Sequence, residues 1–186
     1  MRKSIGFDFD KIFVDYPPLI PDFIIDKLYK KKNHKLTYRF PSYFEQQLRI
    51  ASHIIFLRQP LINNINALSK ISGDKNMDIY LISGRFGFLK KQTNQWLKKY
   101  RIDRFFKKTF FNFNNEQPHL FKDRVLKDLG IEKFIDDDLD LLTHLAINNP
   151  KSEFYWLSKK NLQKTTYLPK NITQINDLNQ FIEKHL

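Results

Sequence analysis

The sequence predicts a three-layer α/β fold, in which a mainly parallel sheet lies between two layers of helices. Strand-like and helix-like segments alternate from residue 77 onward, and one apolar strand precedes them near the N-terminus. Strands that alternate with helices are typical of a parallel sheet. The chain has 186 residues, of which 41% are hydrophobic, so it is long enough to bury one substantial core.

The first strand is expected in the segment SIGFDFDKIFVD, where Ile5, Phe7 and Phe9 alternate with smaller or polar residues. Asp8 and Asp10 stand at its end, although acidic side chains are out of place in a core. Three prolines follow within YPPLIP and forbid both a continuing strand and a helix interior. We interpret these prolines as the exit from the first part of the sheet.

Residues 17–71 are expected to form a helical insertion without strands. The segment DFIIDKLYKK (22–31) has apolar residues at helical spacing, and Ser42 with Glu45 forms a capping-box pattern for a second helix. Pro60 separates two apolar groups at helical spacing, namely Phe44, Leu48, Ile55 and Leu57 before it and Leu61, Ile62, Ile65 and Leu68 after it. The domain prediction is therefore a core of residues 1–16 and 72–186 and a small helical cap of residues 17–71.

Later strands and helices are predicted from their apolar patterns. The predicted strands are MDIYLIS (77–83), KTFFNF (108–113), EKFID (132–136) and SEFYWLS (152–158). The predicted helices are FLKKQTNQWLKKY (88–100), PHLFKDRVLKDLG ending at Gly130, LDLLTHLAINN (139–149) and DLNQFIEKHL (177–186).

Composition limits the chemistry of any site. The chain has no cysteine, so a metal must be held by oxygen or imidazole ligands, which favours a hard cation such as Mg²⁺. The formal charge of +12 admits nucleic acid as a partner. Abundant Lys, Asn, Ile, Phe and Tyr are also expected from A- and T-rich coding DNA. We therefore interpret the basic runs YKKKNHK (29–35) and LSKKNLQK (157–164) as solvated faces.

The sequence gives no sign of a targeting or membrane segment. Acids interrupt the N-terminal apolar run too early for a signal peptide. No apolar run approaches the roughly 20 residues of a membrane-spanning helix. The expectation is a soluble, cytoplasmic protein without a membrane partner, while its oligomeric state stays open.

Polar residues gather where the predicted strands end. Asp8 and Asp10 follow the first strand, Ser83 ends the second, and IDDDLD (135–140) ends a later one. Lys122 lies early in the helix before that last group. In an open parallel sheet the functional site lies beyond the carboxyl ends of the strands, so we expect these side chains to meet there.

Clustered carboxylates favour a metal site and phosphoryl chemistry. They repel each other unless a cation lies between them, and Mg²⁺ bound by oxygen ligands meets that need. One carboxylate can attack phosphorus, while an acid two residues further on exchanges protons with the leaving oxygen and with water. The spacing of Asp8 and Asp10 puts both on one side of an extended chain. The Ser83 hydroxyl and the Lys122 ammonium are suited to bind and neutralise a phosphoryl group.

Four segments resemble, in the correct order, the four motifs of the haloacid dehalogenase (HAD) superfamily. These segments are IGFDFDKIFVD, DIYLISGR, FKDRVLKDLG with Lys122, and EKFIDDD, and the resemblance covers nearly the whole chain apart from the insertion. It implies a Rossmann-like core that hydrolyses phosphomonoesters through an aspartyl-phosphate. Asp8 is then the nucleophile, Asp10 the general acid/base and Lys122 the residue that neutralises charge.

The same resemblance implies the remaining site residues. Ser83, Gly84 and Arg85 would bind substrate or phosphate. Mg²⁺ would be held by Asp8, by the backbone carbonyl of Asp10 and by Asp137, with Asp136 as the second choice because acids crowd this motif. Lys11 departs from the family pattern, in which a small residue usually follows the second aspartate, and its role stays open.

A narrower similarity suggests a substrate. The stretches LISGRFGFLKKQTNQWLKKYRID and FKDRVLKDLGIEKFIDDDLDLLTHLA are similar to bacterial relatives of the 5′(3′)-deoxyribonucleotidases, which implies nucleoside monophosphate substrates and a place for Arg85 beside them. The cap would close over the site and read the leaving group, with Arg49 and Arg58 as candidates for specificity.

Other functions stay open at this stage. The chain could be a phosphatase of sugar phosphates or of nucleic-acid ends, and a nucleic-acid phosphatase would need a continuous basic groove leading to Asp8. It could also be a catalytically silent module that binds nucleic acid or protein. His53, His119 and His144 have no partner at metal-ligand spacing, so we interpret them as packing or surface residues.

Overall fold

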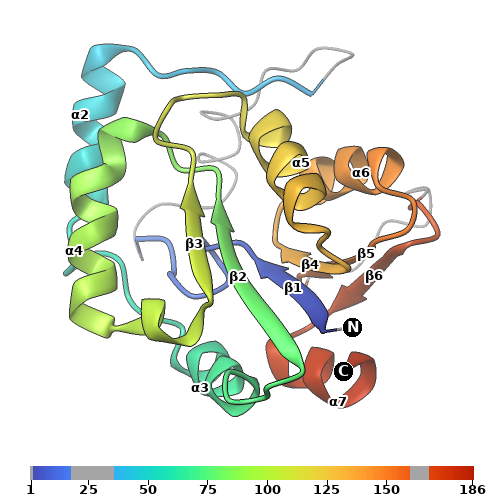
Figure 1. Cartoon of the computed structure of the whole chain (residues 1–186). Helices are drawn as coiled ribbons and strands as arrows, with labels where there is room; N and C mark the ends of the chain where they lie inside the picture. Colours follow the sequence, from blue (N-terminus) through green and yellow to red (C-terminus); the bar gives the residue numbers. More distant parts are fainter. Residues whose placement is uncertain (1, 18–35, 160–167) are drawn as a thin grey trace.

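The computed structural model describes residues 2–17, 36–159 and 168–186, and their strands form one parallel sheet (Figure 1). Each neighbouring pair of strands is parallel, in the order β3-β2-β1-β4-β5-β6. The strands are β1 (Lys3–Phe7), β2 (Met77–Ser83), β3 (Lys108–Phe111), β4 (Lys133–Asp136), β5 (Glu153–Leu157) and β6 (Ile172–Ile175). The predicted fold class is therefore confirmed.

Helices cover both faces of this sheet. They are α2 (Tyr43–Ser52), α3 (Ile62–Ile71), α4 (Lys90–Tyr100), α5 (Pro118–Leu129), α6 (Leu139–Asn148) and α7 (Leu178–His185), with the short 3₁₀ helices η1 (Gly87–Leu89) and η2 (Ile102–Phe105). Helices α5 and α6 pack on one face, while α3, α4 and α7 share a core cluster with the other face. In the described residues, no helix is both long and apolar enough to cross a membrane.

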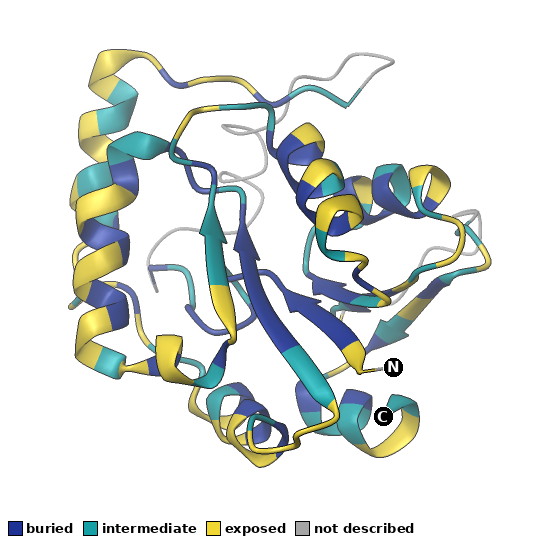
Figure 2. Ribbon diagram, in the orientation of Figure 1, coloured by how far each residue is buried: buried dark blue, intermediate teal, exposed yellow. Residues whose placement is uncertain are grey.

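Two core clusters follow from the alternation of side chains along the strands. Phe134 packs under α5 and α6, whereas the next residue, Ile135, packs in the cluster of α3, α4 and α7. The central strands are buried along most of their length, as Figure 2 shows. Strands buried on both faces read as continuous apolar runs, which is why their positions were predictable.

The strands and helices after residue 77 lie where the sequence predicts them, within one or two residues, apart from β6. Gly130 ends α5 with a positive φ of 60°, as a C-terminal glycine does. Strand β6 was not predicted, because its four residues include Thr173 and Gln174 and carry only a weak apolar pattern. The helix expected at 22–31 and the basic run 29–35 lie outside the described residues, as does most of the run 157–164.

Helix α2 begins with the predicted capping box, since the Ser42 backbone N–H donates a 2.8 Å hydrogen bond to Glu45 Oε2. Its apolar residues do not form a buried stripe among the described residues: Phe44 is 71% and Leu48 55% exposed. The buried residue of this helix is Arg49. The buried side of α2 is therefore polar, and it faces the site described below.

Helix α3 lies within the segment expected to form the cap, but it packs in the core. Ala67, Leu68 and Ile71 are buried in the same cluster as β1, and α3 packs against α7. The division into core and cap stays a prediction. The packing of α3 favours a cap that ends before Ile62.

Candidate active site

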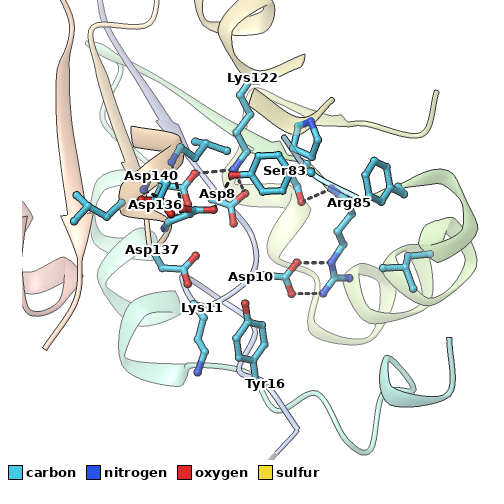
Figure 3. Close-up of a pocket in the computed structure, with 18 of the residues that line it drawn as sticks. Asp8, Asp10, Lys11, Tyr16, Ser83, Arg85, Lys122, Asp136, Asp137 and Asp140 are labelled. Atoms are coloured by element: carbon cyan, nitrogen blue, oxygen red, sulfur yellow. Dashed lines mark hydrogen bonds and ion pairs between the residues drawn. The ribbon is translucent and has the colours of Figure 1, made fainter. Parts of the chain in front are cut away.

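The site lies at the carboxyl ends of three adjacent strands. Asp8 follows β1, Ser83 ends β2, and Asp136 ends β4, and β1 lies between the other two strands. These three residues line one cavity of about 290 Å³, together with Asp10, Gly84, Arg85, Lys122 and Asp137 (Figure 3). The sheet thus brings together every site residue that the sequence predicts.

Lys122 links two of the acids. Its Nζ atom lies 2.6 Å from Asp8 Oδ1 and 2.6 Å from Asp136 Oδ2, and all three side chains are less than 10% exposed. Burial opposes the ammonium charge, but Asp136 and Asp8 raise the pKa of Lys122 above its usual value. Lys122 is therefore charged and neutralises part of the acidic cluster.

Gly84 lets the chain leaving β2 approach the first turn of α5. A Cβ atom at this position would lie 3.0 Å from Pro118 Cβ and 3.8 Å from Lys122 Cε. Such a contact is tighter than ordinary van der Waals packing. The absence of a side chain at Gly84 thus keeps the end of β2 close to Lys122.

Asp8, Asp136 and Asp137 form a group suited to hold a metal ion. Each offers a carboxylate oxygen, and these oxygens lie within 4.8 Å of one another. Burial raises the pKa of Asp8 to about 7, and burial together with Asp136 and Asp8 raises that of Asp137 well above its usual value. A cation between the carboxylates would offset both effects, and their hard oxygen donors suit Mg²⁺.

Asp136 and Asp137 have different surroundings. Asp136 accepts hydrogen bonds from Lys122 Nζ and, at 3.0 Å, from the Asp138 backbone N–H. Within the described residues, no group donates a hydrogen bond to the Asp137 carboxylate, while its backbone carbonyl accepts one from Trp156 Nε1. These contacts favour Asp137 as the more available ligand, although both acids reach the group.

Asp10 lines the same cavity but faces two arginines. Arg85 donates to both carboxylate oxygens, from Nε and from Nη2 at 2.7 Å each, and Arg58 Nη2 also bonds to Oδ1. Burial opposes ionisation, yet the guanidinium groups of Arg85 and Arg58 hold the pKa of Asp10 well below its usual range. Asp10 is thus ionised in this arrangement, and it can donate a proton only after the arginines move to another anion.

The two arginines are themselves held in place. Arg85 Nη1 donates a 3.0 Å hydrogen bond to Thr93 Oγ1, and its guanidinium lies 4.5 Å from the centre of the Phe9 ring. The backbone carbonyl of Arg58 accepts a 2.8 Å hydrogen bond from Trp96 Nε1. Helix α4, which carries Thr93 and Trp96, therefore contacts the Arg85 guanidinium and the Arg58 backbone.

Lys11 and His53 line the cavity but do not belong to the group of Asp8, Asp136 and Asp137. Lys11 adopts a left-handed φ of 59°, and its Nζ pairs with Asp15 at 3.3 Å and lies 4.2 Å from the centre of the Tyr16 ring. In Figure 3 its side chain points away from Asp8. His53 lines the cavity, and its Nδ1 is bonded to the Arg49 carbonyl. The group of Asp8, Asp136 and Asp137 that is suited to hold a metal ion contains no histidine.

Tyr38 is a cavity residue that the sequence did not indicate. Its hydroxyl donates a 2.7 Å hydrogen bond to Asp138 Oδ2, and its backbone N–H and carbonyl both bond to the Gln117 side chain. These partners lie 79 and 100 residues away in the sequence. No local pattern marks such a contact, so only the folded structure reveals that Tyr38 lines the site.

Comparison with solved structures finds haloacid dehalogenase-like hydrolases. One from Xanthomonas campestris shares 10% identity with a TM-score of 0.59, over 97% of this chain and 92% of that chain. An L-2-haloacid dehalogenase shares 10% identity with a TM-score of 0.64, over 98% and 97% of the two chains. A HAD family enzyme from Bacteroides thetaiotaomicron, in complex with magnesium and inorganic phosphate, shares 17% identity with a TM-score of 0.54, over 88% and 98%.

At these identities the likeness shows the fold, which is that of the HAD-like hydrolases. No family model matches the chain, and neither does any curated protein. The similarity to the 5′(3′)-deoxyribonucleotidases therefore stays a prediction.

Proposed function

We propose that the protein is a Mg²⁺-dependent phosphomonoester hydrolase that acts through an aspartyl-phosphate on Asp8. The observation that carries this proposal is that the Asp8 carboxylate combines two features. It belongs to the group of Asp8, Asp136 and Asp137 that is suited to hold a metal ion, and it is bonded to Lys122 Nζ. A nucleophilic carboxylate, a fixed cation and a metal site then converge on one point. That combination can stabilise the charge that develops on a phosphoryl group in transfer.

In the first step, a carboxylate oxygen of Asp8 forms a bond to phosphorus, and the bond from phosphorus to the leaving oxygen breaks. Once Arg58 and Arg85 have moved toward the phosphoryl oxygens, Asp10 takes up a proton from solvent and passes it to the leaving oxygen. In the second step, Asp10 takes a proton from water, which attacks phosphorus and frees Asp8. Bound Mg²⁺ would offset the negative charges of the nucleophile and the phosphoryl group.

Lys122 and Ser83 have supporting roles in this proposal. Lys122 holds the Asp8 carboxylate in place and offsets its charge. Ser83 is buried at the cavity wall, and its hydroxyl is suited to bind a phosphoryl oxygen. Both contributions become stronger where water is excluded.

Nucleoside monophosphates are the substrates we propose, in line with the narrower sequence similarity. The cavity of about 290 Å³ is close to the lower end of small-ligand pockets, and Tyr38, Arg49 and Arg58 are among the residues that line it. A cavity of this size favours a small molecule over the end of a nucleic-acid chain. Sugar phosphates remain the natural comparison substrates.

A dehalogenase is the alternative that the structural neighbours raise. Displacement of a halide from carbon by a carboxylate does not need a second acid to protonate the leaving group, because a halide leaves as an anion. Asp10 and the group of Asp8, Asp136 and Asp137 therefore favour phosphoryl transfer.

Hydrolysis of p-nitrophenyl phosphate with Mg²⁺ and with EDTA tests the proposal. We expect Mg²⁺-dependent turnover that Asp8→Asn abolishes and that Asp128→Asn preserves, since the Asp128 side chain is 65% exposed on α5. A 2-halo acid and a single-stranded RNA are assayed in parallel. Halide release without phosphatase activity, or salt-sensitive RNA binding without any turnover, would refute the proposal.

A further inference from the structure

Three phenylalanine rings form a cluster where the cavity wall meets the surface. The ring centres of Phe40 and Phe86 are 5.1 Å apart, those of Phe86 and Phe88 are 6.1 Å apart, and those of Phe40 and Phe88 are 6.2 Å apart. Phe86 lines the cavity, whereas Phe40 keeps 47% of its surface exposed. We call these three residues the aromatic corner.

The aromatic corner lies close to the reacting group. Phe86 directly follows Arg85 and stands three residues after Ser83, so a chain segment of at most about 10 Å separates Phe86 from Ser83. Leu89 and Pro118 extend the apolar part of the same cavity wall. A substrate with its phosphate at Ser83 would therefore have the Phe86 ring within reach of its leaving group.

The cavity wall has two chemically distinct parts. Near the acids, the cations Arg58, Arg85 and Lys122 are suited to an anionic group. Toward Phe86 the wall is apolar and aromatic, and Phe40 extends that surface to the outside. The complementary ligand has a phosphate at one end and a planar apolar ring system at the other.

We propose that the aromatic corner binds the nucleobase of a nucleoside monophosphate by stacking. This inference rests on the proposed phosphatase function and assigns the part of the site that reads the leaving group. In a nucleoside monophosphate, a single pentose separates the phosphate from the flat π surface of the nucleobase. Stacking on aromatic rings tolerates any base. The corner therefore selects for the presence of a base more than for its identity.

Comparison of a nucleoside 5′-monophosphate with ribose 5-phosphate isolates the contribution of the base. We expect kcat/KM for the nucleotide to exceed that for ribose 5-phosphate by about tenfold or more, since stacking of a base contributes that much binding. Purine and pyrimidine nucleotides should differ by less than that factor. Equal kcat/KM for the nucleotide and ribose 5-phosphate would overturn the inference.

Phe40→Leu tests the corner directly, because an exposed ring can be replaced with little risk to folding. The variant should raise the KM for the nucleotide about tenfold with little change in kcat, and Phe40→Trp should restore the wild-type value. Phe56→Leu is the matched control, since Phe56 is 82% exposed and lies outside the cavity lining. An equal effect of Phe40→Leu and Phe56→Leu would overturn the inference.

The two proposals fail in different ways. If p-nitrophenyl phosphate is hydrolysed with Mg²⁺ but ribose 5-phosphate and nucleotides are equivalent, only the aromatic corner is refuted. If none of these esters is hydrolysed by folded protein, the phosphatase function itself is refuted.

Discussion

Replacement of Lys122 by methionine perturbs the centre of the site with little change in side-chain volume. The ammonium is 4% exposed and bonds to Asp8 and Asp136 at 2.6 Å each. Removal of one partner from a buried ion pair costs about 3–5 kcal/mol, because the remaining charge stays buried without compensation. In Lys122→Met, both Asp8 and Asp136 lose their cation, and Asp137 lies close to them. We therefore expect this variant to lower the free energy of unfolding by at least about 3 kcal/mol.

Mg²⁺ should recover part of that loss. A ligand that binds only the folded state at ten times its Kd stabilises it by about 1.4 kcal/mol. In the wild type, Lys122 competes with the metal for Asp8 and Asp136, whereas in the variant these carboxylates are free to bind it. The stabilisation by Mg²⁺ should therefore be larger in Lys122→Met than in the wild type.

Urea denaturation with and without Mg²⁺ measures both effects. Trp96 and Trp156 lie in the two core clusters on opposite faces of the sheet, so their fluorescence reports on the whole fold. Lys127→Met on the same helix is the control, because the Lys127 side chain is 51% exposed and an i,i+4 pair of this kind contributes about 0.5 kcal/mol or less. If the two lysine variants lose equal stability, or if Mg²⁺ stabilises neither, the reasoning is refuted.

Three further predictions concern other parts of the molecule. Arg85→Lys should raise the KM for phosphate esters about tenfold in steady-state assays. In the proposed reaction the Arg85 guanidinium binds two phosphoryl oxygens, and an ammonium cannot reproduce that bidentate contact. An unchanged KM would contradict this prediction. Burial, with Arg58 and Arg85, holds the pKa of His53 well below 6.5. The unfolded chain therefore takes up a proton below pH 6.5 that the folded state excludes, and stability falls as pH drops through this range by up to about 1.4 kcal/mol per pH unit. Denaturation of His53→Gln at pH 5.5 and 7 should show a smaller difference than the wild type, and an equal difference would refute the assignment. Gly6→Ala should destabilise the protein by about 1–3 kcal/mol, because its Cβ would lie 2.8 Å from the Phe134 ring, whereas Gly73→Ala has no atom within 4 Å and should be nearly neutral; equal melting temperatures of the two variants would contradict the packing.

The fold could be predicted largely from the sequence, because strands buried on both faces leave apolar runs that local patterns reveal. Strand β6 is the exception, since pairing with β5 stabilises a segment whose own residues indicate little. The position of α3 also depends on distant partners. Its apolar residues predict a helix, but only the folded structure shows that Leu68 and Ile71 pack in the core near α7.

The acidic site was predictable for a different reason. In a parallel sheet the carboxyl ends of all strands lie at the same edge, so Asp8, Ser83 and Asp136 were expected at one edge once their strands were recognised. The observed strand order β2-β1-β4 places them side by side. The contacts of Asp10 were not predictable, because Arg58 and Arg85 lie 48 and 75 residues away in the sequence. The spacing of the two aspartates indicated that they share a cavity. It did not indicate that Asp8 pairs with Lys122 while Asp10 pairs with the two arginines.

Mass spectrometry of protein quenched in acid during turnover with Mg²⁺ is the most direct test of the proposed reaction. We expect one phosphoryl group on the peptide that contains Asp8, and we expect hydroxylamine to remove it, as it does from an acyl phosphate. The group should be absent in Asp8→Asn and without Mg²⁺. A phosphoryl group on another residue, or full turnover by Asp8→Asn, would contradict the assignment of Asp8 as the nucleophile.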